Sequence, residues 1–194
     1  MKKTSVQKIK QLFDIITSTY IVMSLFFKYP RTDFTLSEIA KNTGLSKATL
    51  SKIINHLRSV GFITVLDLEV IYRIRANLDN PIFRREKIAF NISSIIRSNI
   101  PELLVQKFHN PKCIIMFGSF RRGEDDQDSD IDIAVEVGHD AKTGQYHFPE
   151  FKEFEDALKR KVTVHVFHRG NIDPNVFMNL ANGIVLYGLL EVSK

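Results

Sequence analysis

Residues 113–137 constrain the fold of this chain more than any other stretch. Cys113 to Phe117 is a continuous apolar run with the length of a buried strand, and the pair Gly118 and Ser119 ends it. Residues 131–137 then alternate β-branched side chains with polar or small ones, which is the pattern of a second strand. The sequence therefore predicts two strands joined by a polar loop.

Two aspartates open the second predicted strand. Because side chains alternate in direction along a strand, Asp130 and Asp132 are expected to project from one face. Two carboxylates on one face repel each other unless a cation lies between them. Mg²⁺ suits such a pair, since it is held by one or two carboxylates while substrate phosphates and water complete its shell. Gly118 permits close approach of the backbone, and the Ser119 hydroxyl and nearby amides can hold a phosphate.

This spacing resembles a known family signature. Gly118 and Ser119, ten intervening residues and then Asp130-Ile131-Asp132 look like the motif of the polymerase-beta-type nucleotidyltransferases. Gly118-Ser119-x-x-x-Gly123 and Ser129-Asp130-Ile131-Asp132-Ile133 resemble the minimal branch of that family. The resemblance covers roughly residues 111 to 190 and implies a small mixed-sheet domain.

The resemblance also implies an activity and a site. Members of the family bind Mg²⁺ and a nucleoside triphosphate and transfer a nucleotidyl group to a hydroxyl or similar acceptor. It assigns Asp130 and Asp132 as catalytic residues and metal ligands, and it places Gly118 and Ser119 at the triphosphate. Arg122, at a position that is often basic in the minimal branch, is implied as a phosphate contact.

The sequence departs from the family pattern at one position. A complete site has a third carboxylate on a later strand, and the candidate strand here is residues 162–167, where Thr163 occupies the best-matching place. His165, two residues on, shares its face. A hydroxyl and a neutral imidazole are poor substitutes for a carboxylate in a site with two Mg²⁺ ions, so nucleotide binding survives this departure better than catalysis does.

Two other interpretations of the acidic loop stay open. Asp126, Asp128, Asp130 and Asp132 alternate as in a calcium loop, although Ile131 stands where an EF-hand requires glycine. A solvated loop without a ligand is the usual meaning of a run of charges.

The distribution of charge divides the chain. Residues 1–110 contain 17 Lys and Arg against 8 Asp and Glu, a net charge of +9, whereas residues 111–194 contain 10 against 14, a net charge of −4. A pI near 9.3 indicates a polyanionic partner, and the basic excess lies entirely in the first part. This division favours two modules, one for a polyanion and one for chemistry.

The basic module has the pattern of a helix-turn-helix. Thr35-Leu36-Ser37-Glu38 is a capping box that opens a short helix, Gly44 supplies a turn, and Ser46 caps a second helix that is expected to run to Val60. The second helix has an apolar stripe of Leu50, Ile53, Ile54, Leu57 and Val60. Its other side is small, polar and basic, as expected of a helix that enters the major groove of DNA. The predicted DNA-binding residues are Lys47, Thr49, Ser51, Lys52, Asn55 and Arg58.

A hairpin is expected after this helix, with strands at residues 62–66 and 70–74. Residues 35–75 thus resemble the winged-helix DNA-binding domains of bacterial and archaeal regulators. The acidic tip, with Asp67 and Glu69, disfavours insertion of the wing into the minor groove. Winged helices also serve as protein-binding modules or dimerisation platforms, and that alternative remains beside the DNA-binding one.

Together these patterns predict an α+β protein in three parts. A winged helix-turn-helix occupies residues 1–78, a helical connector residues 79–110, and a nucleotidyltransferase-like domain residues 111–194. The apolar stretch at residues 6–27 is interrupted by Asp14 and is too short for a bilayer span, so it is expected to be the first helix of the winged domain. The apolar connector favours packing against a domain or a second copy of the chain, and a homodimer is a hypothesis. The single cysteine, Cys113, cannot form a disulfide within the chain, so a cytoplasmic protein without a membrane partner is expected.

Two functions from different classes follow. The first is an enzyme that transfers a nucleotidyl group to a protein side chain, as some antitoxins do to a partner toxin, or to another hydroxyl acceptor. The second is a transcriptional regulator whose nucleotidyltransferase fold has lost turnover and senses a nucleotide. Thr163 in the place of the third carboxylate favours the sensor, and the intact Gly-Ser and Asp-x-Asp motifs favour the enzyme.

Overall fold

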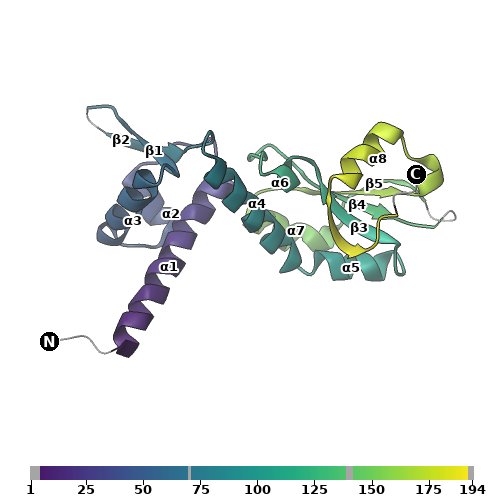
Figure 1. The fold of residues 1–194 in the computed structure, drawn as a ribbon, viewed down its shortest axis with the longest axis horizontal. Helices are drawn as coiled ribbons and strands as arrows, with labels where there is room; N and C mark the ends of the chain where they lie inside the picture. Colours follow the sequence, from purple (N-terminus) through teal and green to yellow (C-terminus); the bar gives the residue numbers. More distant parts are fainter. Residues whose placement is uncertain (1–4, 70, 139–141, 192–194) are drawn as a thin grey trace. The chain divides into compact units, whose positions relative to one another are not determined.

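A computed structural model describes residues 5–69, 71–138 and 142–191 of the chain. It divides into two compact units, Met1–Phe83 and Arg84–Lys194. Figure 1 labels the α-helices of both units and strands β1 to β5. No helix among the described residues is long and apolar enough to cross a membrane.

The first unit contains three helices followed by a hairpin. The helices are α1 (Ser5–Lys28), α2 (Leu36–Thr43) and α3 (Lys47–Ser59), and the antiparallel strands are β1 (Ile63–Asp67) and β2 (Tyr72–Ala76). The predicted capping box opens α2: the Thr35 hydroxyl accepts from the backbone N–H of Glu38, whose carboxylate accepts from the Thr35 N–H at 2.7 Å. Gly44 ends α2 in the left-handed conformation, and the Ser46 hydroxyl caps α3.

Two sequence predictions in this unit need correction. The hairpin strands begin later than predicted, at residues 63 and 72, and Val70, the expected first residue of the second strand, lies outside the described residues. Val60 does not belong to the apolar stripe, because α3 ends at Ser59 and the Val60 side chain remains 48% exposed at the helix cap. The other four stripe residues, Leu50, Ile53, Ile54 and Leu57, are buried.

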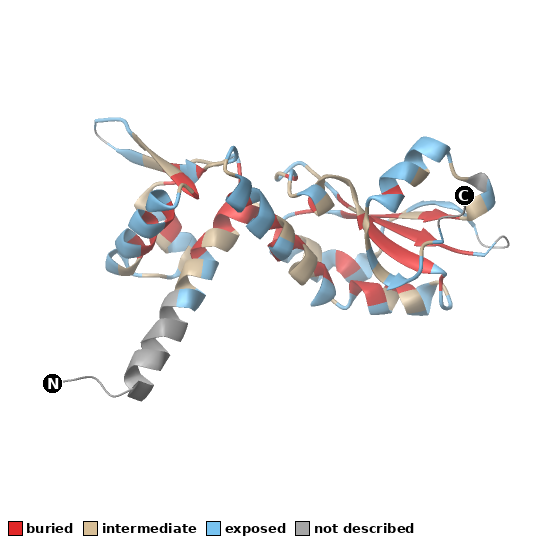
Figure 2. Cartoon of the chain, viewed as in Figure 1, coloured by how far each residue is buried: buried red, intermediate tan, exposed pale blue. Residues whose placement is uncertain are grey.

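Aromatic rings hold the core of the first unit together. Phe27 of α1 packs against Phe62, before β1, and Phe83, with ring centroids 5.7 and 5.4 Å away. The rings of Phe62 and Phe83 lie 4.8 Å apart. Figure 2 shows the buried residues of α1 and α3 gathered on the sides that face the core. Contacts of this kind stabilise a core beyond the area they bury.

The second unit is built on a five-stranded sheet. In chain order its strands are β3 (Cys113–Phe117), β4 (Ile131–Glu136), β5 (Gly144–Tyr146), β6 (Val162–Phe167) and β7 (Ile184–Gly188), and their spatial order is β5-β6-β4-β3-β7. Strands β4 and β6 are parallel, and the other neighbours are antiparallel. Strand β5 was absent from the sequence prediction, because Gly-Gln-Tyr carries no hydrophobic alternation.

Helices occupy the remainder of this unit. The connector forms α4 (Pro81–Ile96) and α5 (Ile100–Lys107), and the unit boundary falls inside α4. Pro101 lies in the first turn of α5, after Asn99 in the left-handed conformation. The Gly-Ser turn forms the one-turn helix α6 (Gly118–Arg122). A 3-10 turn, Pro149–Phe151, leads into α7 (Lys152–Leu158), and Lys159 ends this helix with φ 57°. Helix α8 (Pro174–Ala181) is capped by Asp173.

The two faces of the sheet differ in chemistry. Figure 1 shows α5 and α7 on one side and α8 on the other. Ile114, Met116, Ile133 and Val164 are fully buried on the first face. On the second face, Leu180 of α8 covers Ile115, Ala134 and Phe167. The polar residues 130, 132, 163 and 165 continue this face beyond the helix, so one end of it is free to hold a ligand.

Candidate functional site

Asp130 and Asp132 project from the same face of the sheet. Asp130 lies directly before β4, Asp132 is its second residue, and each bonds to the neighbouring strand β6. The Thr163 hydroxyl donates to Oδ2 of Asp130 at 3.1 Å, and Nε2 of His165 lies 3.0 Å from Oδ1 of Asp132. Thr163 and His165 are two residues apart on one strand, so the two aspartates must share their face.

Gly118 brings the start of α6 against Asp132. Its φ of 72° belongs to the left-handed region, which favours glycine. A Cβ added there would overlap Oδ2 of Asp132 and would lie 3.3 Å from its Cγ. The Gly118 backbone and the Asp132 carboxylate therefore approach more closely than any other residue would allow. The first N–H groups of a helix have no partner inside the helix, so those at the start of α6 suit an anion beside Asp132.

His165 orients Asp132. Its Nε2 faces the Asp132 carboxylate, and a carboxylate only accepts, while its Nδ1 lies 3.4 Å from the side-chain nitrogen of Gln145. The ring proton then lies on Nε2 and is donated to Asp132. In this tautomer Nε2 has no lone pair for a metal or an acceptor proton, and His165 acts on the carboxylate. The Phe117 ring holds the imidazole from the other side, with centroids 5.2 Å apart at 70°.

The carboxylates fit Mg²⁺ only together with a phosphorylated substrate. Among the described residues, no group of three or more His, Cys, Asp or Glu side chains is placed to hold a metal ion. Thr163, the residue in the place of the third carboxylate, donates a hydrogen bond from its hydroxyl to Asp130. The site thus offers two carboxylates, which is the number that Mg²⁺ takes when phosphates and water supply its other ligands. The acidic loop offers no calcium cage among these residues either.

Arg122 and Ser119 are placed differently. Ser119 is half-buried in the first turn of α6, next to Gly118. Arg122 lies at the other end of this helix, and its Nε donates to Glu124 at 2.6 Å. Arg84 of α4 also forms an ion pair with Glu124. The hydrogen bond from Arg122 is the main reason that the pKa of Glu124 lies below its ordinary value. To contact a phosphate, Arg122 must break its hydrogen bond with the Glu124 carboxylate.

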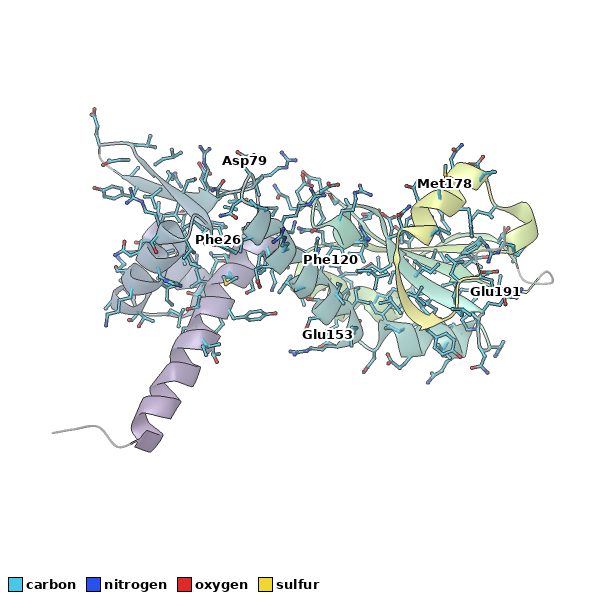
Figure 3. The ribbon with its side chains drawn as sticks, viewed as in Figure 1. Phe26, Asp79, Phe120, Glu153, Met178 and Glu191 are labelled. Atoms are coloured by element: carbon cyan, nitrogen blue, oxygen red, sulfur yellow. The ribbon has the colours of Figure 1, made fainter. Side chains whose placement is uncertain are left out.

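Sequence reasoning missed a buried polar cluster beneath the loop between α6 and β4. Asp125 accepts from Lys87 Nζ at 3.0 Å, from Asn91 Nδ2 at 2.8 Å and from two nitrogens of Arg160 at 3.1 and 3.2 Å. All four side chains are buried. Burial lowers the pKa of Lys87, and the charge of Asp125 opposes this effect. Asn91 also donates to the backbone carbonyl of Phe120, which is labelled in Figure 3.

This cluster fixes the loop that leads to the site. It ties α4, α6 and Arg160, two residues before β6, to Asp125, which lies five residues before Asp130 in the sequence. In the sequence, Asp125 stood in a run of acidic residues that is normally solvated. The spacing of Lys87 and Asn91, one helical turn apart, was the only local signal that they share a face. Nearby, the Asp126 carboxylate accepts from the Asp128 N–H and the Ser129 hydroxyl, so it shapes a turn.

The predicted DNA-binding residues all belong to α3 or its first turn. Lys47, Lys52, Asn55 and Arg58 are exposed. The hydroxyls of Thr49 and Ser51 form hydrogen bonds within the helix region: Thr49 bonds to the Ser46 hydroxyl at 2.9 Å, and Ser51 donates to the Lys47 carbonyl. The helix therefore presents three cations and one amide to solvent, opposite its buried stripe.

Comparison with known families locates one domain. Residues 97–185 match the family model of the nucleotidyltransferase domain, so this part of the chain carries a nucleotidyltransferase domain. The matched region contains α5, the whole sheet as far as β7 and all of the residues gathered around Asp130 and Asp132. No curated protein sequence and no solved structure matches the chain.

Proposed function

We propose that the nucleotidyltransferase domain binds a nucleoside triphosphate with Mg²⁺ and transfers its nucleotidyl group to a hydroxyl acceptor. The observation that carries this proposal is the convergence of Asp130, Asp132 and Gly118. The two carboxylates share one face at the end of the sheet, and the backbone of Gly118 lies against one of them. A phosphate chain and a divalent cation are the ligands that this combination suits.

Each side chain has a defined part in the proposed reaction. Asp130 and Asp132 hold the metal, Thr163 and His165 orient them, and Gly118 and Ser119 bind the phosphates of the leaving group. Arg122 adds a charge-assisted contact when it releases Glu124. When bound, Mg²⁺ neutralises charge that develops on the phosphates during transfer.

The acceptor is proposed to approach the α-phosphorus from the side opposite the leaving group. Phosphoryl and nucleotidyl transfer place the attacking and leaving oxygens in line. A protein side chain with a hydroxyl is one acceptor that fits an open site of this kind.

A second candidate function is a nucleotide sensor in a transcriptional regulator. The observation that favours it is the use of Thr163 and His165 where the family has a third carboxylate. Both side chains already bond to an aspartate, the Thr163 hydroxyl to Asp130 and Nε2 of His165 to Asp132. In this case the domain binds the nucleotide without turnover.

The first unit is proposed to be a winged helix that binds DNA. Three helices followed by a hairpin, a basic exposed side on α3 and the excess of 12 Lys and Arg over 6 Asp and Glu in residues 1–83 support this assignment. The alternative is a protein-binding module, because winged helices that bind proteins have the same order of helices and strands.

The enzyme and the sensor are distinguished by label transfer. The purified chain is incubated with Mg²⁺ and each triphosphate labelled at the α-phosphate, with and without the product of the neighbouring gene. We expect label on an acceptor with the wild type and none with Asp130→Ala/Asp132→Ala. Saturable binding without transfer to any tested acceptor supports the sensor. If triphosphate binding is equal in the wild type and the double variant, the proposed site is wrong.

A further inference from the structure

A groove of about 480 Å³ opens beside the candidate metal site. His165 and Phe117 form its inner wall, and both flank Asp132: His165 bonds to it, and Phe117 is its partner in the register of β3 and β4. The groove continues under α8, where Ile172 and Val176 line it. The groove thus borders the candidate metal site through His165 and Phe117, the two lining residues that flank Asp132.

We propose that this groove binds the nucleobase of the nucleoside triphosphate. The inference rests on the proposed function, since it assumes that the phosphates lie at Gly118 and Asp132. A base is flat and apolar on its faces and polar at its edge. The groove matches both properties, because rings and aliphatic side chains form its walls and amide side chains stand at its rim.

Two amides can read the edge of a base. Gln145 is the register partner of His165 across β5 and β6, so it lies on the same face of the sheet. Its nitrogen faces the imidazole at 3.4 Å, which leaves its carbonyl oxygen as an acceptor for a base amino group. Asn179 of α8 lines the other side. Amide side chains pair with base edges through one donor and one acceptor, and adenine is the base that they match best.

The other cavity at the site has the wrong chemistry for a base. It has a volume of about 430 Å³ and opens at Asp130. Its wall consists mainly of charged side chains, among them Lys152, Glu155, Asp156 and Lys159, and no aromatic residue lines it. A flat apolar ring gains little from such a surface.

The test separates the base from the phosphates. Affinities of the full chain for ATP, GTP, CTP, UTP and inorganic tripolyphosphate are measured by calorimetry with Mg²⁺. Val176→Trp fills the groove, so we expect it to weaken ATP binding at least tenfold and to leave tripolyphosphate binding unchanged. Gln145→Leu is expected to reduce the preference among the four bases several-fold. Met178→Trp is the matched control, since Met178 is 58% exposed on the same helix and lies outside the groove (Figure 3).

The outcomes distinguish this inference from the proposed function. ATP binding that is unchanged in both Val176→Trp and Gln145→Leu would overturn the groove as a base site. Equal weakening of ATP and tripolyphosphate by Val176→Trp would also contradict it, because the groove would then not discriminate the base. Loss of acceptor labelling with normal ATP binding would assign the groove to the acceptor. A wild-type chain that binds no tripolyphosphate overturns the proposed function, and the base site with it.

Discussion

At the scale of single residues, Gly118 is the position where the backbone itself limits what the site can contain. Its left-handed conformation and its contact with Asp132 impose separate penalties on any side chain. We expect Gly118→Ala to lose about 1–2 kcal/mol of stability from the backbone conformation and to weaken Mg²⁺-dependent nucleotide binding strongly, because the methyl group displaces Asp132. Gly44→Ala is the control. Gly44 has nearly the same φ, 71°, with no atom within 4 Å of an added Cβ, so it should lose stability without affecting nucleotide binding. Equal nucleotide affinity in both variants would show that the contact with Asp132 is unimportant.

Cys113 illustrates how burial sets the chemistry of one side chain. Burial is the main cause that raises the pKa of its thiol to about 12, and the neighbouring Glu136 carboxylate adds to it. Because the thiolate is the reactive form, Cys113 should not react with a thiol reagent at pH 8 in the native protein. Unfolding in guanidinium should release one reactive thiol, the only one in the chain. Rapid modification under native conditions would mean that β3 opens readily.

At the scale of elements, the buried cluster around Asp125 decides how firmly the loop before β4 is held. Asp125→Asn removes the negative charge that lies 3.0 Å from Lys87 Nζ and 3.1 Å from Arg160, and both cations stay buried. Breaking a buried pair in this way costs about 3–5 kcal/mol, so we expect a large fall in the denaturant midpoint. Asp156→Asn is the control, because its ion pair with Lys152 is exposed and screened. If the two variants unfold alike, the cluster contributes no more than a surface pair.

The elements that could be predicted from the sequence are those with a local signal. The Thr35 capping box and the Ser46 cap each satisfy the first N–H groups of a helix within a few residues. The alternation of residues 131–137 likewise placed β4 and put both aspartates on one face. By contrast, β5 and the Asp125 cluster depend on contacts between segments 20 or more residues apart, such as Gln145 with His165 and Asp125 with Arg160. No periodicity along the chain reports such contacts.

At the scale of the whole molecule, the separation of charge predicts that the two units bind different anions. The proposed DNA surface is α3, so we expect Lys47→Ala, Lys52→Ala and Arg58→Ala together to abolish most of the affinity for DNA. If each cation contacts a phosphate, the slope of log affinity against log salt should fall by about 3. Binding of Mg²⁺ and nucleotide by the second unit should not change, because its proposed site contains none of these residues.

The matched control for this test removes the same amount of charge from the second unit. Lys142, Lys152 and Lys159 are exposed there, and their replacement by alanine lowers the net charge equally. If both triple variants weaken DNA binding alike, the interaction follows overall charge and α3 is not a specific surface. If the α3 variant binds DNA as the wild type does, the first unit does not use this helix on DNA, and a protein partner becomes the better assignment for it. Salt titration of each variant, monitored by fluorescence anisotropy of a labelled duplex, distinguishes these outcomes.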